Sequence, residues 1–317
     1  MKVMFKPKTL YEIEDINKQA KAGGFIAACE ADYAARVAAV ADAVGQKGAS
    51  IVMISGPSAS GKTTSARKLA IEFISRGRHA HVVSLDDFFI GVKNYPKLPD
   101  GSPDMENVRA LDIEKIHGCL NELIKTGRSE LPLFDFVTQE RSAKTHVIAL
   151  SPGDVLIIEG IHALNPLLSE TVEEGRVFKL YAGLRAEYAE NGKRIVATRD
   201  LRIARRLLRD WYFRGHAVER TLKMWNSLCD GEEKWIKPFK KDADMLLDTA
   251  FPYEPCVTAP QLAAVCADAQ QGGAERDTLL AINKRFSQFV ALPVDEVPRD
   301  SMIREFYGGL ELPGEFA

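Results

Sequence analysis

Short, mostly apolar runs alternate with amphipathic stretches along the middle of this chain. The apolar runs, which are bounded by turn residues, lie at 51–54, 81–85, 155–158, 177–181 and 245–247. Such runs are typical of strands buried on both faces of a sheet. Apolar positions at helical spacing occur between them, at 62–76, 109–126, 199–213 and 217–228. This alternation predicts an α/β fold with a mostly parallel sheet covered by helices on both faces.

Helical patterns also flank this central region, at 9–47, 258–267 and 274–290. We therefore expect an N-terminal helical extension over 1–48, a core domain over 49–254 and a C-terminal helical appendage over 255–317. One segment, residues 90–107, is rich in Pro, Gly and Asp and predicts a long loop. Long loops inside compact domains are often functional.

Composition and charge limit the kinds of molecule that the protein is expected to bind. The 317 residues include 42 Lys and Arg against 44 Asp and Glu, a net charge of −2, and general nucleic-acid binding needs a basic surface. No apolar run approaches the length of a membrane span, and the first eight residues lack the apolar core of a secretory signal. Five scattered cysteines indicate neither a disulfide framework nor a zinc site. We expect a cytoplasmic protein without nucleic-acid or membrane partners.

Residues 56–63 match the phosphate-binding pattern G-x-x-x-x-G-K-[ST] between a predicted strand and a predicted helix, the context that the pattern requires. Glycines let backbone N–H groups approach phosphate oxygens, and the helix N-terminus favours an anion. Lys62 is expected to reach the β- and γ-phosphates, and the Thr63 hydroxyl to bind Mg²⁺. The loop residues expected to contact the nucleotide are Gly56, Pro57, Ser58, Ala59, Ser60, Gly61, Lys62, Thr63 and Thr64.

This loop alone does not separate kinases from GTPases, ATPases and motors. A GTPase also needs a guanine-reading Asn-Lys-x-Asp. In the second half of the chain, residues 283–286 read Asn-Lys-Arg-Phe and lack the Asp. The sequence therefore gives little support to a GTPase.

Carboxylates follow two of the predicted strands. Asp86 comes after the run 81–85, and Glu159 comes after the run 155–158. Ligands of open α/β sheets bind beyond the carboxyl ends of the strands. Carboxylates there can hold Mg²⁺, and one can take a proton from a hydroxyl group. We expect Thr63, Asp86 and Glu159 to hold the metal, with Asp86 also orienting and deprotonating the acceptor.

Arginines recur at helical spacing in the second half of the chain. Ile203, Leu207 and Trp211 predict the buried face of this helix. On another face lies the arginine stripe, which consists of Arg202, Arg205, Arg206 and Arg209. A solvated amphipathic helix has such a pattern too. Beside a phosphate-binding loop, however, the stripe predicts a lid, about 199–215, whose guanidinium groups close over the phosphates, with Arg205 and Arg209 acting on the transferring group.

Taken together, these elements resemble the uridine kinase/phosphoribulokinase family of P-loop kinases over about residues 50–250. Asp86-Asp87-Phe88-Phe89 is similar to the family's D-x-F-[YF] element, and 158–162 to its E-G-I-h element. Residues 202–215 resemble its R-x-x-R-R-x-x-R-D-x-x-x-R-G lid. The resemblance implies a P-loop NTPase three-layer fold, with Asp86 as the base and Glu159 supporting Mg²⁺. It also implies that Asp244, in the late Ala-Asp element, lies near the adenine.

The acceptor side resembles the family less closely. Glu106 stands where the family has an Asp that binds ribose hydroxyls, so the resemblance implies that role here. Phe134 and Gln139 stand where uridine and cytidine kinases have a Tyr and a His that hold the pyrimidine, and Arg220 stands where a Gln is expected. Phe134 can still stack on a base and Gln139 can still hydrogen-bond one. With Arg214 of the lid, these residues form the predicted acceptor site.

These observations predict a kinase that uses ATP and Mg²⁺ to phosphorylate a small molecule at the 5′-hydroxyl of a nucleoside such as uridine or cytidine. Two alternatives stay open. The acceptor could be a sugar phosphate, pantothenate or another polyol, with Arg220 and the arginine stripe reading its charge. The chain could also be a regulatory module that binds ATP without turnover, although binding alone does not need Asp86. The sequence leaves a homo-oligomer open.

Overall fold

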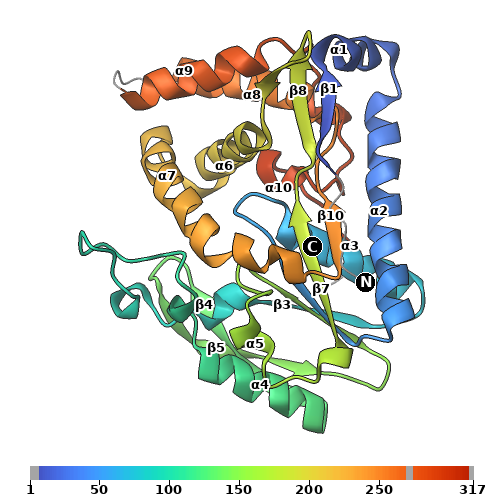
Figure 1. Ribbon diagram of the computed structural model, residues 1–317, viewed down its shortest axis with the longest axis vertical. Helices are drawn as coiled ribbons and strands as arrows, with labels where there is room; N and C mark the ends of the chain where they lie inside the picture. Colours follow the sequence, from blue (N-terminus) through green and yellow to red (C-terminus); the bar gives the residue numbers. More distant parts are fainter. Residues whose placement is uncertain (1–6, 269–273, 314–317) are drawn as a thin grey trace.

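The computed structural model describes residues 7–268 and 274–313 (Figure 1). The first six residues, which we expected not to form a secretory signal, lie outside these ranges. The strands are β1 (Thr9–Glu12), β2 (Ile51–Ser55), β3 (Ala80–Ser84), β4 (Arg128–Asp135), β5 (Glu140–Ala149), β6 (Val155–Glu159), β7 (Val177–Gly183), β8 (Ala186–Glu190), β9 (Lys193–Val196) and β10 (Met245–Asp248). The helices are α1 (Ile13–Ala22), α2 (Phe25–Lys47), α3 (Lys62–Ser75), α4 (Ile113–Thr126), α5 (Pro166–Ser169), α6 (Thr198–Arg214), α7 (Val218–Trp235), α8 (Glu254–Asp268), α9 (Ala274–Phe286) and α10 (Arg304–Tyr307).

A five-stranded sheet with the order β10-β7-β2-β6-β3 forms the centre of the molecule, and every pair of neighbours in it is parallel. All five strands were predicted from the apolar runs, so the α/β fold is confirmed. Because the strands are parallel, their carboxyl ends lie at one edge of the sheet. The phosphate-binding loop, Asp86 and Glu159 all follow or end strands at this edge.

Alternate residues of each strand face opposite sides of the sheet, and each side has its own hydrophobic core. Val52 and Ile54 pack into the larger core, which includes residues of α2, α3, α6 and α8. Ile51 and Met53 face the second core, which α4 covers. Figure 1 shows α6 to α9 gathered at one end of the molecule, and α4 with the β4–β5 hairpin at the other. The layers on both sides of the sheet therefore follow from its apolar periodicity.

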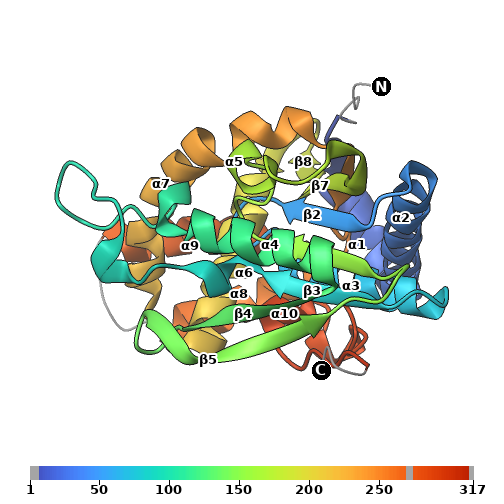
Figure 2. The ribbon, with the colours of Figure 1, turned by 90° about the horizontal axis from the view of Figure 1, so that it is seen from below.

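Some elements were not predicted from the apolar runs, and one of them, β1, depends on pairing over a long sequence distance. Residues 9–12, expected to be helical, form β1, which pairs in parallel with β8. Residues 128–149 form the antiparallel hairpin of β4 and β5, which extends beside α4 (Figure 2). The segment 90–107, predicted as a loop, contains one short 3₁₀ turn, Val92–Asn94, among irregular residues.

The predicted three-part division of the chain is not reflected in separate cores. The larger core takes side chains from α2 in the N-terminal extension, from the central sheet, and from α8, α9 and α10 near the C-terminus.

Within the described ranges, none of the helices combines the length and apolar character needed to cross a bilayer.

Candidate active site

The loop between β2 and α3 turns tightly at the carboxyl edge of the sheet. Gly56 lies so close to the Ala182 carbonyl oxygen that a side chain would have no room there. Gly61 adopts a left-handed φ of 81°, and Ala59 does so at 57°. Residues in this conformation turn successive backbone N–H groups toward one side, which makes a concave surface for an anion. The loop therefore has the backbone shape of a phosphate cradle.

Cationic side chains from two elements contact this loop. Lys62 Nζ donates to the Pro57 carbonyl oxygen at 3.1 Å, so the ammonium group folds back over the loop. From α6, Arg206 Nη1 donates to Ser58 Oγ at 2.7 Å. Arg202 Nε donates to the Ser58 carbonyl oxygen at 2.9 Å. The fold thus gathers three positive charges where the phosphates of a nucleotide would lie.

Glu159, the last residue of β6, is buried beside the start of α3. Its Oε1 accepts hydrogen bonds from Thr63 Oγ1 at 3.2 Å and from Ser84 Oγ at 2.9 Å. Burial and the charge of Asp86 raise the pKa of Glu159 to about 7, although Lys62 and the Ser84 hydrogen bond act in the opposite direction. The charge of Asp86 therefore acts on the Glu159 carboxylate.

Asp86 lies in the 3₁₀ turn Leu85–Phe88 that follows β3. Its backbone N–H donates to Ser84 Oγ at 3.3 Å. Burial raises the pKa of Asp86, whereas the charges of Lys62, Arg214 and Arg209 lower it. Three predicted site residues from two other helices thus act on this carboxylate, as expected if all of them line one cleft.

The oxygen donors at this point suit a hard divalent cation. Thr63 offers a hydroxyl group, and Glu159 and Asp86 offer carboxylates, which is the donor set that Mg²⁺ prefers. Mg²⁺ in kinases is typically held by one or two carboxylates together with substrate phosphates. The residues present therefore fit the predicted metal, provided that a nucleotide supplies further ligands.

The lid helix α6 is less exposed than we expected. Asp210, which is only 1% exposed, lies within 3.3 Å of Arg206, 3.1 Å of Arg209 and 3.6 Å of Arg214. Arg202 forms an ion pair with the buried Glu232 of α7. Acids inside the fold thus neutralise Arg202, Arg206, Arg209 and Arg214. One carboxylate from each of α6 and α7 carries out this neutralisation.

Arg205 is the most deeply buried arginine of the stripe. Its side chain is completely buried, and its Nε and Nη2 donate to the two carboxylate oxygens of Glu254 at 2.5 and 2.7 Å. Nη2 also donates to the Thr249 carbonyl oxygen at 2.8 Å, and Nη1 to that of Ala59 at 3.4 Å. The predicted direct action on the phosphoryl group therefore needs correction: this guanidinium group holds the loop backbone and α8 together.

Glu106 comes close to the same cluster from the long loop before α4. Its side chain packs against Gly231 of α7, where a Cβ atom would collide with it. Burial and the charge of Glu232 raise the pKa of Glu106 to about 7, while Arg206 and Lys62 lower it. Its Oε2 is buried without a hydrogen-bond partner. An unpartnered carboxylate oxygen near Lys62 is suited to accept a hydrogen bond from a substrate hydroxyl.

The two predicted base-contacting residues lie at the tip of the β4–β5 hairpin. Phe134 is buried in an aromatic cluster, with ring centroids 5.5 Å from Phe89 and 5.2 Å from Phe136. Its backbone N–H donates to Asp87 Oδ1 at 3.3 Å, which ties the hairpin to the turn that carries Asp86. Gln139 Nε2 donates to the Phe136 carbonyl oxygen at 2.8 Å. Gln139 therefore stabilises its own turn.

Two other predicted residues are not brought into this cluster. Asp244 precedes β10, away from the carboxyl edge, and its carboxylate binds Lys47 at 2.8 Å and the backbone N–H of Lys179 at 2.7 Å. The expectation that Asp244 lies near the adenine is thus corrected, because Asp244 lies at the amino end of β10, whereas the phosphate-binding loop lies at the carboxyl edge of the sheet. Arg220 is exposed in the first turn of α7.

Sequence reasoning missed two residues that shape the site. Ser84 ends β3 and bridges Glu159 and Asp86, so the rule that found the strand-end carboxylates could also have found it. Glu232 accepts a hydrogen bond from the Ser58 backbone N–H at 2.9 Å. No local pattern marks Glu232, because its role depends on how α7 packs against the phosphate loop.

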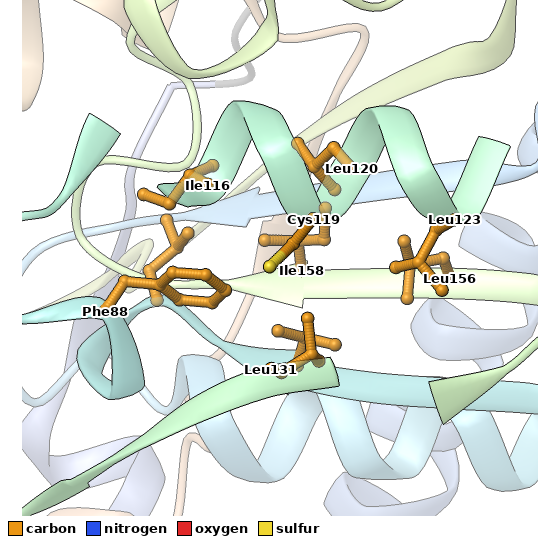
Figure 3. A pocket seen from close by; sticks show the side chains of 10 residues that line it. Phe88, Ile116, Cys119, Leu120, Leu123, Leu131, Leu156 and Ile158 are labelled. Carbon is orange, nitrogen blue, oxygen red and sulfur yellow. The ribbon is translucent and has the colours of Figure 1, made fainter. Parts of the chain in front are cut away.

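A small cavity lies away from these polar groups, between α4 and the sheet (Figure 3). Its walls are apolar side chains such as Phe88, Cys119 and Ile158. Cavities of this kind stay dry and offer nothing to orient a polar substrate. We therefore assign this cavity to core packing.

Comparison with known proteins agrees with this geometry. A family model described as the phosphoribulokinase/uridine kinase family matches residues 51–252. A uridine kinase from Borreliella burgdorferi (strain ZS7) is 31% identical over 204 residues, which cover 63% of this chain and 86% of that protein. A uridine kinase from Mycoplasma genitalium is 27% identical over 198 residues, covering 62% of this chain and 84% of that one.

A solved structure has a similar fold. The protein, described as a candidate fructose transport system kinase from Silicibacter sp. TM1040, superimposes with a TM-score of 0.50 at 22% identity. The similarity covers 66% of this chain and 98% of that one. At this identity the likeness supports the fold alone.

Proposed function

Because this chain belongs to the phosphoribulokinase/uridine kinase family, whose model matches residues 51–252, we propose that it transfers the γ-phosphoryl group of ATP to the 5′-hydroxyl of a nucleoside such as uridine or cytidine. The observation that carries the proposal is the chain of hydrogen bonds at the end of the sheet, in which Glu159 accepts from Thr63 and Ser84, and Ser84 accepts from the backbone of Asp86. These bonds place the start of α3, which carries Lys62, next to the two strand-end carboxylates.

In the proposed reaction, the phosphate loop and Lys62 hold the triphosphate, while Thr63 and Glu159 hold Mg²⁺. The metal supplies positive charge that neutralises the β- and γ-phosphate oxygens. Asp86 accepts a hydrogen bond from the acceptor hydroxyl and takes its proton as the oxygen bonds to the γ-phosphorus and ADP leaves. Because the transition state is loose, positioning by Asp86 matters more than its basicity.

The lid arginines complete this proposal. Arg202 and Arg206 contact Ser58 of the phosphate loop, and Arg209 and Arg214 act on Asp86 through their charge. Guanidinium groups in such positions stabilise negative charge on the transferring group. The buried Asp210 fixes their orientation. Exclusion of water by the lid would limit hydrolysis of ATP.

Two features support a nucleoside acceptor. The similar proteins from Borreliella and Mycoplasma are uridine kinases. Glu106 has an unpartnered carboxylate oxygen for ribose hydroxyls, and the backbone hydrogen bond from Phe134 to Asp87 places this aromatic residue beside the turn of Asp86. The second proposal replaces the nucleoside with a sugar phosphate, pantothenate or another polyol. Phe134 and Gln139, which stand where uridine and cytidine kinases have a Tyr and a His, favour it.

A substrate screen distinguishes these proposals. Purified protein with ATP and Mg²⁺ is tested against nucleosides, sugar phosphates and pantothenate, with ADP formation as the readout. We expect turnover with uridine or cytidine. Turnover only with other acceptors would overturn the nucleoside assignment. Binding of ATP without turnover on any acceptor would favour a regulatory module.

Replacing Glu106 with alanine is expected to raise the KM for the acceptor by about 10–150-fold, the effect of losing one hydrogen bond to a charged group. The KM for ATP should change little. Glu106→Asp should recover part of the loss, and Glu114→Ala, which removes an exposed glutamate on α4, serves as the control. Steady-state kinetics with each substrate varied separately test this; an unchanged acceptor KM would remove Glu106 from the acceptor site.

Replacing Arg209 with alanine is expected to lower kcat by roughly 10²–10³-fold, as for other residues that stabilise transition-state charge. The KM for ATP should rise much less, because the interaction strengthens only as the phosphoryl group transfers. Arg176→Ala removes an exposed arginine at the opposite end of β7 and is the control. A change confined to KM would show that Arg209 contributes only to ground-state binding.

A further inference from the structure

The C-terminal part of the chain returns to the phosphate loop. Residues 301–308, which include α10, lie beyond the range 51–252 that the family model matches. Figure 1 shows α10 beside α6, near the start of α3. The side chain of Met302 fills the space next to Gly61. Glu305 Oε2 accepts hydrogen bonds from Thr64 Oγ1 at 2.7 Å and from the Thr64 backbone N–H at 3.4 Å.

These two donors belong to the surface that would bind phosphate. Thr64 is the third residue of α3, so its N–H has no partner within the helix. The first N–H groups of a helix that follows a glycine-rich loop bind phosphate oxygens. A carboxylate oxygen of Glu305 therefore occupies donors that a nucleotide phosphate would use. Its charge also reaches Glu159, whose pKa it helps to raise behind the larger effects of burial and Asp86.

Glu305 differs from the other carboxylate at the loop. Glu232, which accepts from the Ser58 N–H, is completely buried and paired with Arg202. Glu305 is only half-buried. Within residues 7–268 and 274–313, its carboxylate binds Thr64 and forms no salt bridge. Moving the Glu305 carboxylate away from the loop therefore costs less free energy than moving that of Glu232.

The backbone around Glu305 is held in place on both sides. Ser301 Oγ donates to Glu30 Oε1 at 2.6 Å, and the Tyr307 hydroxyl lies 2.6 Å from Thr258 Oγ1. Arg304 Nη2 donates to the Val297 carbonyl oxygen at 2.6 Å. These anchors favour rotation of the Glu305 side chain over release of the whole segment.

We propose that Glu305 is an internal competitor for the nucleotide, whose carboxylate occupies phosphate-binding donors at Thr64 and must swing away before a nucleotide binds fully. The inference rests on the proposed ATP site. A protein whose binding-competent state is only partly populated binds its ligand more weakly in proportion to that population. Glu305 therefore sets the nucleotide affinity of this kinase below what its phosphate loop alone would give.

Replacing Glu305 with glutamine tests the inference, since the amide keeps the size of the side chain and removes its charge. If the contact forms in about nine-tenths of the molecules and loss of the charge abolishes it, the Kd for MgADP should fall roughly tenfold; an amide that still accepts from Thr64 in some molecules gives a smaller fall. The Kd for inorganic tripolyphosphate, which carries only the phosphate charge, should fall as well. Isothermal titration calorimetry measures both. Glu311→Gln, which neutralises an exposed glutamate in the same terminal segment, should leave both values unchanged.

The alternative role for Glu305 is structural, as an acid that stabilises the start of α3. In that case Glu305→Gln would leave the Kd for MgADP unchanged or raise it, and either result overturns the inference. If Glu305→Gln does not fold, Glu305→Asp, which retracts the charge by one methylene group, should still tighten MgADP binding in part; no tightening would refute the competition. Failure of both wild type and variant to bind MgADP would instead reject the proposed ATP site and the inference with it.

Discussion

The Asp86→Asn variant should lose phosphoryl transfer while it retains nucleotide binding. We expect kcat to fall by about 10²–10⁴-fold, the usual contribution of a general base. Asparagine has nearly the same shape and keeps the backbone hydrogen bond to Ser84, so the turn should not move. The charge that Lys62, Arg209 and Arg214 act on would disappear, and with it the group that receives the acceptor proton.

Asp87→Asn provides a matched control for this variant. Asp87 accepts the backbone N–H of Phe134 at 3.3 Å, and an asparagine side-chain oxygen can accept the same bond. Its effect on kcat should therefore be much smaller. Single-turnover kinetics and calorimetric titration with MgADP separate chemistry from binding. An Asp86→Asn enzyme with near wild-type turnover would refute the role of Asp86 as the base.

Breaking the buried Arg205–Glu254 pair should cause the largest loss of stability. In the Arg205→Met variant, the carboxylate of Glu254 would remain fully buried without its partner. Removing one member of such a pair typically costs about 3–5 kcal/mol. We expect the melting temperature to fall by roughly 5–15 °C. Burial by itself lowers the pKa of Arg205, but the charge of Glu254 outweighs it and the pKa is raised, so the guanidinium group stays ionised.

The double variant Arg205→Met/Glu254→Met distinguishes an ion pair from general packing. Because it removes both charges, it should unfold at a higher temperature than either single variant, giving a large coupling energy in a double-mutant cycle. Lys18→Met, which breaks the exposed pair with Glu14 on α1, should change the melting temperature little. Additive losses in the cycle would show that Arg205 and Glu254 contribute independently. Circular dichroism melts provide the measurement.

Local patterns were sufficient for the central sheet and the phosphate loop. All five strands were predicted because parallel strands covered on both faces need continuous apolar residues, which stand out in a single sequence. The loop at 56–63 was predicted because its glycines and its lysine occur at fixed spacing. Asp86 and Glu159 were found by the rule that ligands bind where parallel strands end. Each of these features depends on residues that are neighbours in the chain.

Other features depend on partners that are far apart in the sequence. The residues of β1 became a strand because β8, more than 170 positions later, offers them a free edge. Arg205 continues the helical spacing of the arginine stripe, but its ion pair with Glu254 of α8 holds its side chain inside the fold. Asp244 was expected near the adenine by analogy, and the register of β10 carries it to the other end of the strand.

The sequence by itself therefore determined the α/β fold, its family and the chemical groups at the carboxyl edge of the sheet, because periodicity and fixed spacing are local properties. The tertiary structure decided which of four similar arginines meet the phosphate loop, which acids neutralise them, and that Glu305 reaches Thr64. Those outcomes follow from the packing of α6, α7, α8 and α10 around the loop. The charge and burial of a side chain depend on this packing, and no short stretch of residues encodes it.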